Sequence, residues 1–317
     1  MSYSVAPHVP CSTGCHIGRE KGGSPLRLVS YLDAAGDRLG VQRHDGRIWS
    51  SHTLGAGLAG SMAALLAGGH TALEALRAAA RSAGAAGQPG DVDPSRLLAP
   101  VPRPGKIVAV GLNYHAHAVE GGVAIPTVPM IFAKFPTAVV GPGATVEWDP
   151  ELTAAVDMEA ELGVVIGRSA RRVDEEAALH HVLGYTCLND VSARDLQYAD
   201  KQFVRAKSLD TFCPMGPALV TADEIPDPGV LAVRSYRNGE LMQDGNTADL
   251  IFSVPYLVAF CSRAFTLEPG DVIATGTPAG VGYFREPRVL MGEGDVMTVE
   301  IEGIGRLENP CHEVRPD

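Results

Sequence analysis

Hydrophobic and polar positions alternate over the first part of the chain in a way that predicts a small α+β unit. The stretch RLVSYLD alternates as a strand does, and LGVQRHDGRIWSS predicts a hairpin that turns at Asp45 and Gly46. Apolar residues then recur at helical spacing over 62–83, which predicts one or two helices. Residues 84–105 are dense in glycine, proline and aspartate, as linkers are. We therefore predict a small amino-terminal domain with its linker over residues 26–100.

Short strands dominate the region from 105 to 317, which we predict to be a second and larger domain. Helical patterns occur there near 175–181 and 252–264, and Asn238-Gly239 predicts a tight hairpin turn. Many short strands between turns favour a mainly β barrel or rolled sheet within an α+β fold, and not a doubly wound parallel sheet. The stretches that predict strands are IVAVGL, MIFAKF, ELGVVIG, YTCLND, PALV, LAVRSYRNGE, DVIATG and VMTVEIEGIG.

The first 25 residues lack periodicity and predict an extension to the folded part. Cys11 and Cys15 stand beside His16, a set that zinc can use, but no second ligand pair follows at finger-like spacing. A flexible tail is the interpretation we prefer. The same residues show no charged-then-apolar signal pattern, and no apolar run in the chain approaches the length of a membrane span. We expect a cytoplasmic protein that uses no membrane.

Composition and charge exclude several classes of partner. The 317 residues include 45% hydrophobic and 20% charged residues, which is ordinary for a globular enzyme-sized chain. The formal charge of −11 comes without any basic stripe, so we predict no nucleic-acid partner. The six cysteines are scattered, and those beyond the extension mostly lie in apolar contexts, as free thiols in a reducing compartment do.

Three carboxylates near two predicted strands are the strongest candidate for chemistry. Glu159 and Glu161 lie two residues apart just before the apolar run LGVVI, so a strand would point both to one face. Asp190 ends the next strand, YTCLND. Three oxygen ligands suit Mg²⁺, Mn²⁺ or Ca²⁺. The alternative is that these residues form an ordinary solvated strand face.

A possible general base follows the first strand of the larger domain. If residues 114–120 form a helix, His117 and Glu120 face each other three residues apart, and the carboxylate would orient the imidazole as a base toward water. The alternative is a surface contact. Gly121 and Gly122 follow, as the hinge of a lid would.

Several cations and one glycine-rich loop complete the candidates. Lysine is scarce, so Lys134 and Lys207 could supply compact ammonium groups, although two random surface lysines remain an alternative. Arg194 and Gln197 follow Asp190 closely and would form a polar rim, with the guanidinium suited to a substrate carboxylate. The loop GTPAGVG after a strand is weak evidence for nucleotide binding, because no clear helix follows it.

Taken together, these stretches resemble the fumarylacetoacetate hydrolase family. The resemblance covers nearly all of residues 105–310 in the family's order. Residues 26–100 look like the small amino-terminal domain that many members carry. The stretches that carry the resemblance are GLNYHAHAVE, FAKFPTAVVGPG, DMEAELGVVIG, GYTCLNDVSARDLQ, KSLDTFCPMGP, FTLEPGDVIATGTPAGVG and GDVMTVEIEGIGRLENP.

The resemblance implies a set of roles. It implies the family's β-roll fold, usually as a homodimer, with Glu159, Glu161 and Asp190 holding Mg²⁺ or Mn²⁺. His117 and Glu120 look like the water-activating dyad. The remaining residues that match catalytic or substrate-lining positions are Lys207, Arg194, Gln197, Thr277 and, less closely, Lys134.

The leading functional hypothesis from the sequence is a metal-dependent hydrolase that cleaves a C–C bond in a β-diketo acid of acylpyruvate or fumarylpyruvate type. The ion would polarise adjacent oxygens of this small keto-acid substrate, and His117 would activate water. The same scaffold also suits an oxaloacetate decarboxylase, a keto–enol isomerase or a sugar-acid dehydratase, because fold does not fix reaction. A non-catalytic, Ca²⁺-stabilised domain is a further alternative.

Overall fold

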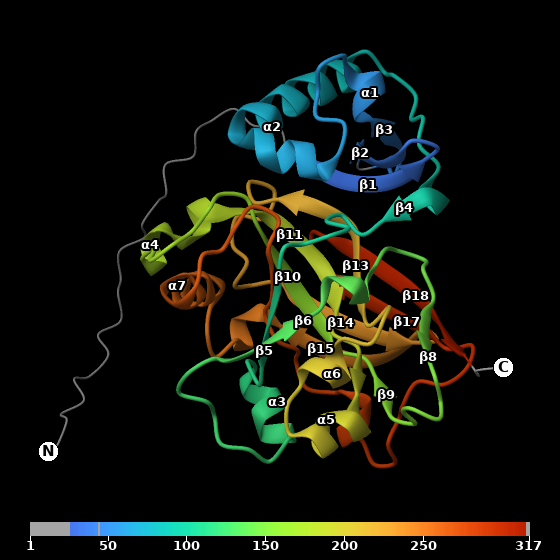
Figure 1. The fold of residues 1–317 in the computed structure, drawn as a ribbon, viewed down its shortest axis with the longest axis vertical. Coiled ribbons are helices and arrows are strands. Elements are labelled where there is room, and N and C mark those ends of the chain that lie inside the picture. Colours follow the sequence, from blue (N-terminus) through green and yellow to red (C-terminus); the bar gives the residue numbers. More distant parts are fainter. Residues whose placement is uncertain (1–25, 44, 315–317) are drawn as a thin grey trace, which may run out of the picture.

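Two open sheets form the body of the protein. The structure is a computed structural model that describes residues 26–43 and 45–314; the extension over 1–25, with Cys11 and Cys15, lies outside the described residues. The larger sheet has the strand order β3-β2-β1-β13-β11-β10-β16-β5-β6, with β4 beside β1 and β7 beside β13 (Figure 1). The smaller has the order β15-β14-β17-β18-β8, and β9 pairs with β12.

The strands are short, as predicted. Those of the larger sheet are β1 (Arg27–Asp33), β2 (Gly36–Gln42), β3 (Ile48–Ser50), β4 (Leu97–Leu98), β5 (Ile107–Gly111), β6 (Met130–Lys134), β7 (Val139–Val140), β10 (Ala160–Ile166), β11 (Val182–Asn189), β13 (Cys213–Thr221) and β16 (Val272–Ala274). The others are β8 (Val146–Trp148), β9 (Val156–Asp157), β12 (Ser192–Ala193), β14 (Ala232–Arg237), β15 (Glu240–Asn246), β17 (Val296–Ile301) and β18 (Gly305–Glu313).

Most neighbouring strands are antiparallel, which confirms a mainly β, α+β fold and not a doubly wound parallel sheet. The parallel pairs are β5 with β16, β7 with β13, and β8 with β18. The barrel half of the prediction is wrong: among the described strands the larger sheet ends at β3 and β6, which do not pair with each other. Closure depends on how the edge strands meet, and local alternation carries no information about that.

Seven α-helices surround the sheets in the part of the chain that the structure describes. They are α1 (Ser51–Leu54), α2 (Met62–Ala85), α3 (His115–Glu120), α4 (Glu175–Ala178), α5 (Arg194–Asp200), α6 (Val204–Lys207) and α7 (Val254–Ala264). In Figure 1, α3, α5 and α6 lie together at the lower end of the molecule, while α2 lies at the top. No helix in the described ranges combines the length and apolar character that crossing a bilayer requires.

The local predictions of turns and long helices are confirmed. Asn238 and Gly239 have φ of 52° and 83° and join β14 to β15, which is the turn that Asn-Gly favours. The hairpin of β2 and β3 turns at Asp45 and Gly46. The predicted helical stretch over 62–83 is α2, kinked at Gly69. The sequence did not predict α5 and α6, because such short, polar helices carry no clear hydrophobic period.

The amino-terminal segment shares a core with the rest of the chain. Strand β1 pairs with β13, with Leu28 opposite Leu219. One continuous hydrophobic cluster contains Leu28 and Leu76 together with Leu188 and Leu219. Burial of these side chains stabilises the contact between the two parts of the chain. The boundary between residues 26–100 and 105–317 stays a prediction.

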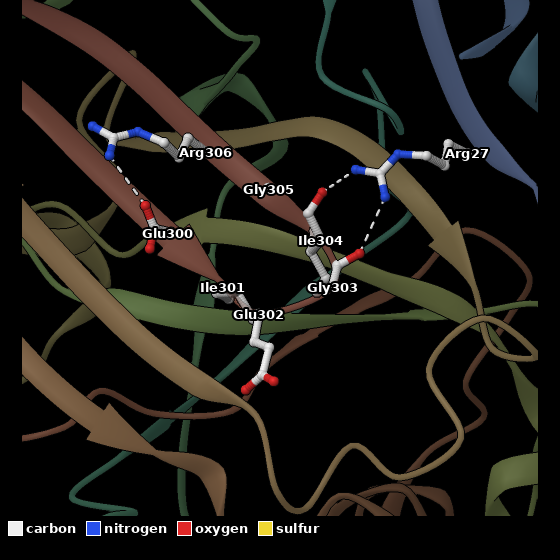
Figure 2. Close-up of a pocket in the computed structure, with 8 residues that line it drawn as sticks. All are labelled: Arg27, Glu300, Ile301, Glu302, Gly303, Ile304, Gly305 and Arg306. Atoms are coloured by element: carbon white, nitrogen blue, oxygen red, sulfur yellow. Dashed lines mark hydrogen bonds and ion pairs between the residues drawn. The ribbon is translucent and has the colours of Figure 1, made fainter. Parts of the chain in front are cut away.

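Arg27 links the two sheets at the surface. Its guanidinium donates to the carbonyl of Gly303, at 3.1 Å, and to the carbonyl of Ile304, in the turn between β17 and β18 (Figure 2). These residues line a surface pocket together with Glu300 and Arg306, which form an ion pair at 3.1 Å. None of the predicted site residues lines this pocket.

Candidate active site

The three predicted metal ligands lie at one end of the pair β10 and β11. Glu161 is in β10, Glu159 comes just before it, and Asp190 follows β11 directly. Ala160 lies opposite Asn189 in the antiparallel register, and the Asp190 N–H donates to the carbonyl of Glu159 at 2.9 Å. Ligand oxygens of the three carboxylates lie within 4.8 Å of one another. Pairing of adjacent strands thus brings the predicted ligands together.

These carboxylates are buried, so the solvated-face alternative is wrong. Glu159 is 5% exposed, and Glu161 and Asp190 are each 1% exposed. Burial and the negative charges of Asp190 and Glu159 raise the pKa of Glu161 well above its usual range. Burial also opposes ionisation of Glu159, but Lys207, Arg194 and His117 outweigh it and lower the pKa of this group. The cluster requires positive charge close by.

Two buried lysines supply part of that charge. Lys207 Nζ lies 2.6 Å from Glu159 Oε2 and 2.7 Å from Asp190 Oδ2. Lys134 Nζ lies 2.6 Å from Asp190 Oδ1 and also donates to the carbonyl of Lys207. Both side chains are almost fully buried, so the interpretation of random surface lysines is wrong.

The residues present fit a divalent cation. Four buried carboxylates, including Asp157, are accompanied by three buried cations, Lys134, Lys207 and Arg194, which pair with Asp157, Glu159 and Asp190. Within the described part of the chain Glu161 forms no salt bridge, and its Oε2 accepts from the Gly276 N–H at 2.8 Å. Oxygen-only donors at this separation suit Mg²⁺, Mn²⁺ or Ca²⁺.

Arg194 is held between two carboxylates. Its Nε and Nη2 donate to Asp157 Oδ2 at 3.0 and 2.8 Å, and its Nη1 lies 2.7 Å from Glu159 Oε1. Nη1 also donates to Gln197 Oε1 at 3.1 Å, one turn along α5. The guanidinium therefore orients Glu159. The roles predicted for Arg194 and Gln197 in substrate binding stay predictions.

The glycine-rich loop after β16 binds protein carboxylates through its backbone. Besides the Gly276 contact to Glu161, the Gly280 N–H donates to Glu120 at 2.7 Å and the Gly282 N–H to Asp157 at 2.9 Å. Gly280 has φ of 105°, and a Cβ there would lie 2.4 Å from the Met242 carbonyl oxygen. Sequence reasoning missed these three contacts between glycine amides and carboxylates, because the loop gave only weak evidence for nucleotide binding.

His117 and Glu120 form the predicted pair on α3. Glu120 Oε2 lies 3.0 Å from His117 Nδ1, while its other oxygen accepts from the loop at Gly280. The carboxylate favours the proton on Nδ1 and leaves Nε2 as the basic nitrogen. His117 is 6% exposed and acts on the pKa of Glu159, so the surface-contact alternative is wrong. The imidazole therefore lies close enough to the carboxylate cluster to act electrostatically on Glu159, and its role as a base stays a prediction.

Thr277 and Gln243 fix the start of β10. The Thr277 hydroxyl donates to the Ala160 carbonyl at 3.0 Å, and Gln243 Nε2 donates to that hydroxyl at 2.7 Å. Gln243 Oε1 accepts from the Ala160 N–H, between the two glutamate ligands. Sequence reasoning missed Gln243, because nothing local to β15 points to a partner 83 residues away. Substrate binding by Thr277 stays a prediction.

We predict that Arg194→Lys weakens Mg²⁺ binding about tenfold to a hundredfold, the usual effect of losing a group that orients a ligand. A lysine cannot contact Asp157 and Glu159 as the planar guanidinium does. Calorimetric titration of metal-free protein with MgCl₂ measures this. Arg205→Lys is the matched control, since Arg205 pairs with Asp200 on the exposed side of α5. Unchanged Mg²⁺ affinity in folded Arg194→Lys protein would contradict the orienting role.

Comparison with known proteins identifies the family. The family model described as Fumarylacetoacetate (FAA) hydrolase C-terminal matches residues 106–312. "Oxaloacetate tautomerase fahd2, mitochondrial" of Xenopus laevis is 41% identical over 290 residues, 90% of each chain. "Oxaloacetate tautomerase YisK" of Bacillus subtilis is 48% identical over 217 residues, 68% of this chain and 72% of its own.

A solved structure extends the match to three dimensions. The fumarylacetoacetate hydrolase of Exiguobacterium antarcticum superposes with a TM-score of 0.75 at 37% identity, covering 91% of this chain and all of its own. The family model covers well over half of the sequence, and both relatives exceed 40% identity. The chain belongs to the fumarylacetoacetate hydrolase family of enzymes.

Proposed function

We propose that this protein catalyses the keto–enol tautomerisation of oxaloacetate or a closely similar 2-keto acid. The observation that carries the proposal is that His117, oriented by Glu120, lies beside three buried carboxylates that can hold a divalent ion. A positioned base next to an electrophilic centre is what proton removal adjacent to a carbonyl requires. The names of the two relatives, both oxaloacetate tautomerases, favour this reaction among those that the sequence left open.

The proton moves through His117. In the keto-to-enol direction, Nε2 takes a proton from carbon 3, and Glu120 stabilises the imidazolium through Nδ1. Return of that proton to the keto oxygen completes the enol, so no atom is gained or lost. Mg²⁺ or Mn²⁺, held by Glu159, Glu161 and Asp190, would supply Lewis-acid stabilisation of negative charge on that oxygen.

Lys207 acts as a fixed positive charge. Burial opposes its protonation, but Asp190 and Glu159 outweigh burial and raise its pKa. The side chain is therefore an ammonium at neutral pH and cannot serve as a base. It holds two ligands in place and would stabilise charge on the substrate oxygen. Lys134 supports it from the other side of Asp190.

The ions, the assembly and the compartment predicted from the sequence remain predictions. Mg²⁺ and Mn²⁺ remain the predicted ions, with Ca²⁺ as a possible substitute in vitro. A homodimer remains the predicted assembly. The cytoplasm also remains a prediction, set against a Xenopus relative whose name includes "mitochondrial".

Hydrolysis of an acylpyruvate is the second candidate. The same His117–Glu120 pair could activate water, and the superposed Exiguobacterium protein is a fumarylacetoacetate hydrolase by name. Hydrolysis needs a water placed at the distal carbonyl in addition to the groups that tautomerisation uses. Tautomerisation is therefore the simpler use of the contacts described.

A substrate panel tests the choice. Enol oxaloacetate is added to Mg²⁺-loaded protein, and the loss of enol absorbance is followed against a buffer blank and an EDTA-treated sample. Faster, Mg²⁺-dependent ketonisation without release of CO₂ supports the proposal. Release of CO₂ and pyruvate would instead show a decarboxylase, and acetate plus pyruvate from acetylpyruvate a hydrolase. If a metal raises the melting temperature but no substrate is turned over, the protein is a non-catalytic, metal-stabilised domain.

A further inference from the structure

We propose that Arg288 binds the distal carboxylate of a dicarboxylic keto acid and gives this site its preference for dianions. The inference rests on the proposed function, because it names the part of the substrate that the carboxylate cluster cannot bind. Arg288 follows the glycine-rich loop GTPAGVG, which ends at Gly282.

Arg288 lies at one end of a series of contacting aromatic rings, and His117 lies at the other end. Its guanidinium carbon lies 4.0 Å from the centre of the Tyr283 ring. Tyr283 stacks on Tyr198 at 5.2 Å and meets the edge of Phe284 at 5.6 Å, and the Phe284 ring lies 5.9 Å from that of His117. The arginine therefore lies on the same side of the molecule as the proposed base, two aromatic rings away.

The backbone of Tyr283 connects this series of rings to the carboxylate cluster. Its N–H donates to Asp157 Oδ2 at 3.0 Å, the oxygen that also binds Arg194. Burial raises the pKa of Tyr198, and the charges of Arg194, Glu159 and Arg288 act on the same phenol. Tyr198 and Arg288 both contact the Tyr283 ring, and Tyr198 also lies within electrostatic range of Arg194 and Glu159, so the exposed arginine lies near the buried cluster.

The other cations around the site are already engaged. Lys134, Lys207 and Arg194 contact carboxylates, and Arg285 donates to the carbonyls of Gly280 and Met242. Arg288 is exposed and forms no ion pair or hydrogen bond with any residue in 26–43 or 45–314. Stacking on Tyr283 orders the guanidinium while leaving its N–H edge available for a carboxylate.

The two ends of a dicarboxylic 2-keto acid require different binding groups. The carboxylate and keto oxygens at one end of a 2-keto acid are adjacent and suit an ion held by the buried cluster. A second carboxylate at the other end must then lie away from Glu159, Glu161 and Asp190, because these three buried acids would repel it. In a chain of net charge −11, an unpaired cation at the rim is the group that can accept it.

Binding measurements without turnover test the proposal. Mg²⁺-loaded protein is titrated with malate, which carries a distal carboxylate, and with oxalate, which does not. In Arg288→Gln, malate should bind about tenfold or more weakly, as loss of a charge-assisted hydrogen bond predicts, while oxalate binding stays unchanged. Arg288→Lys should recover part of the malate affinity. Arg263→Gln, the same change at an exposed position of α7, should alter the binding of neither ligand.

Two results would overturn the proposal: equal weakening of malate and oxalate in Arg288→Gln, or malate binding that the substitution leaves unchanged. The outcome is separable from that of the proposed function. If the wild-type protein fails to ketonise oxaloacetate but binds malate in an Arg288-dependent way, tautomerisation is wrong and the carboxylate site stands. If the wild-type protein ketonises oxaloacetate but Arg288→Gln does not change malate affinity, tautomerisation stands and the carboxylate site at Arg288 is wrong.

Discussion

Glu161→Gln should bind Mg²⁺ more than about a hundredfold more weakly than the wild-type protein, because groups that merely orient ligands already contribute ten- to a hundredfold. The change removes one of three ligand oxygens while conserving shape, and the Gly276 N–H can still donate to the amide oxygen. Turnover on oxaloacetate should fall with the affinity. Calorimetric titration with MgCl₂ and ketonisation assays at saturating Mg²⁺ measure the two effects separately.

The stability of the metal-free protein provides a second test of Glu161→Gln. Burial and its acidic neighbours raise the folded-state pKa of Glu161 above the unfolded value, so the folded state binds the extra proton. The free energy of unfolding of the wild type must then fall as pH rises from about 4.3, the ordinary glutamate value, toward the raised pKa. In EDTA at neutral pH, Glu161→Gln should therefore melt at a higher temperature than the wild type.

The exposed residue Glu240 in β15 provides the matched control, and Glu240→Gln should change neither Mg²⁺ affinity nor the melting temperature in EDTA. Wild-type Mg²⁺ affinity in Glu161→Gln would remove Glu161 from the ligand set. A lower melting temperature in EDTA would show that its buried charge is compensated by contacts other than a metal.

His117→Gln should reduce kcat by about 10²- to 10⁴-fold, the usual contribution of a positioned general base. Mg²⁺ affinity should stay close to that of the wild type, because His117 is not one of the three clustered ligands. Glu120→Gln should lower kcat less, since it weakens the orientation of the imidazole and leaves the base present. Stopped-flow ketonisation rates with parallel Mg²⁺ titrations separate loss of chemistry from loss of metal.

The same helix offers a matched control. His115 is half exposed, and its Nδ1 contacts the Asp249 carbonyl at 2.9 Å, outside the carboxylate cluster. His115→Gln should retain nearly all of the wild-type kcat. Full activity in His117→Gln, or an equal loss in both variants, would show that proton transfer does not pass through His117.

The sequence predicted the parts of the site that lie close together along the chain or follow a strand period. Glu159 and Glu161 share a face because side chains alternate along a strand, and His117 meets Glu120 because helix positions three apart are neighbours. Asp190 could be added because it ends the strand that follows. These inferences need only local geometry.

The supporting contacts could not be predicted, because they join segments far apart in sequence. The Gly276 amide reaches Glu161 across 115 residues, and the Gly282 amide reaches Asp157 across 125. Its position shortly after Asp190 suggested a substrate carboxylate as a partner of Arg194, a role that stays a prediction, but its contacts with Asp157 and Glu159 could not be read from the sequence. Sheet closure and the short helices α5 and α6 depend on tertiary packing in the same way.

We propose that Glu159, Glu161 and Asp190 together hold one divalent ion. Anomalous diffraction from crystals soaked in MnCl₂ tests it most directly. We expect a single manganese peak within about 2.0–2.4 Å of an oxygen from each of the three carboxylates, the range that hard cations adopt. A contradictory result would be no peak there at saturating Mn²⁺, with Lys207 Nζ still 2.6 Å from Glu159 and 2.7 Å from Asp190.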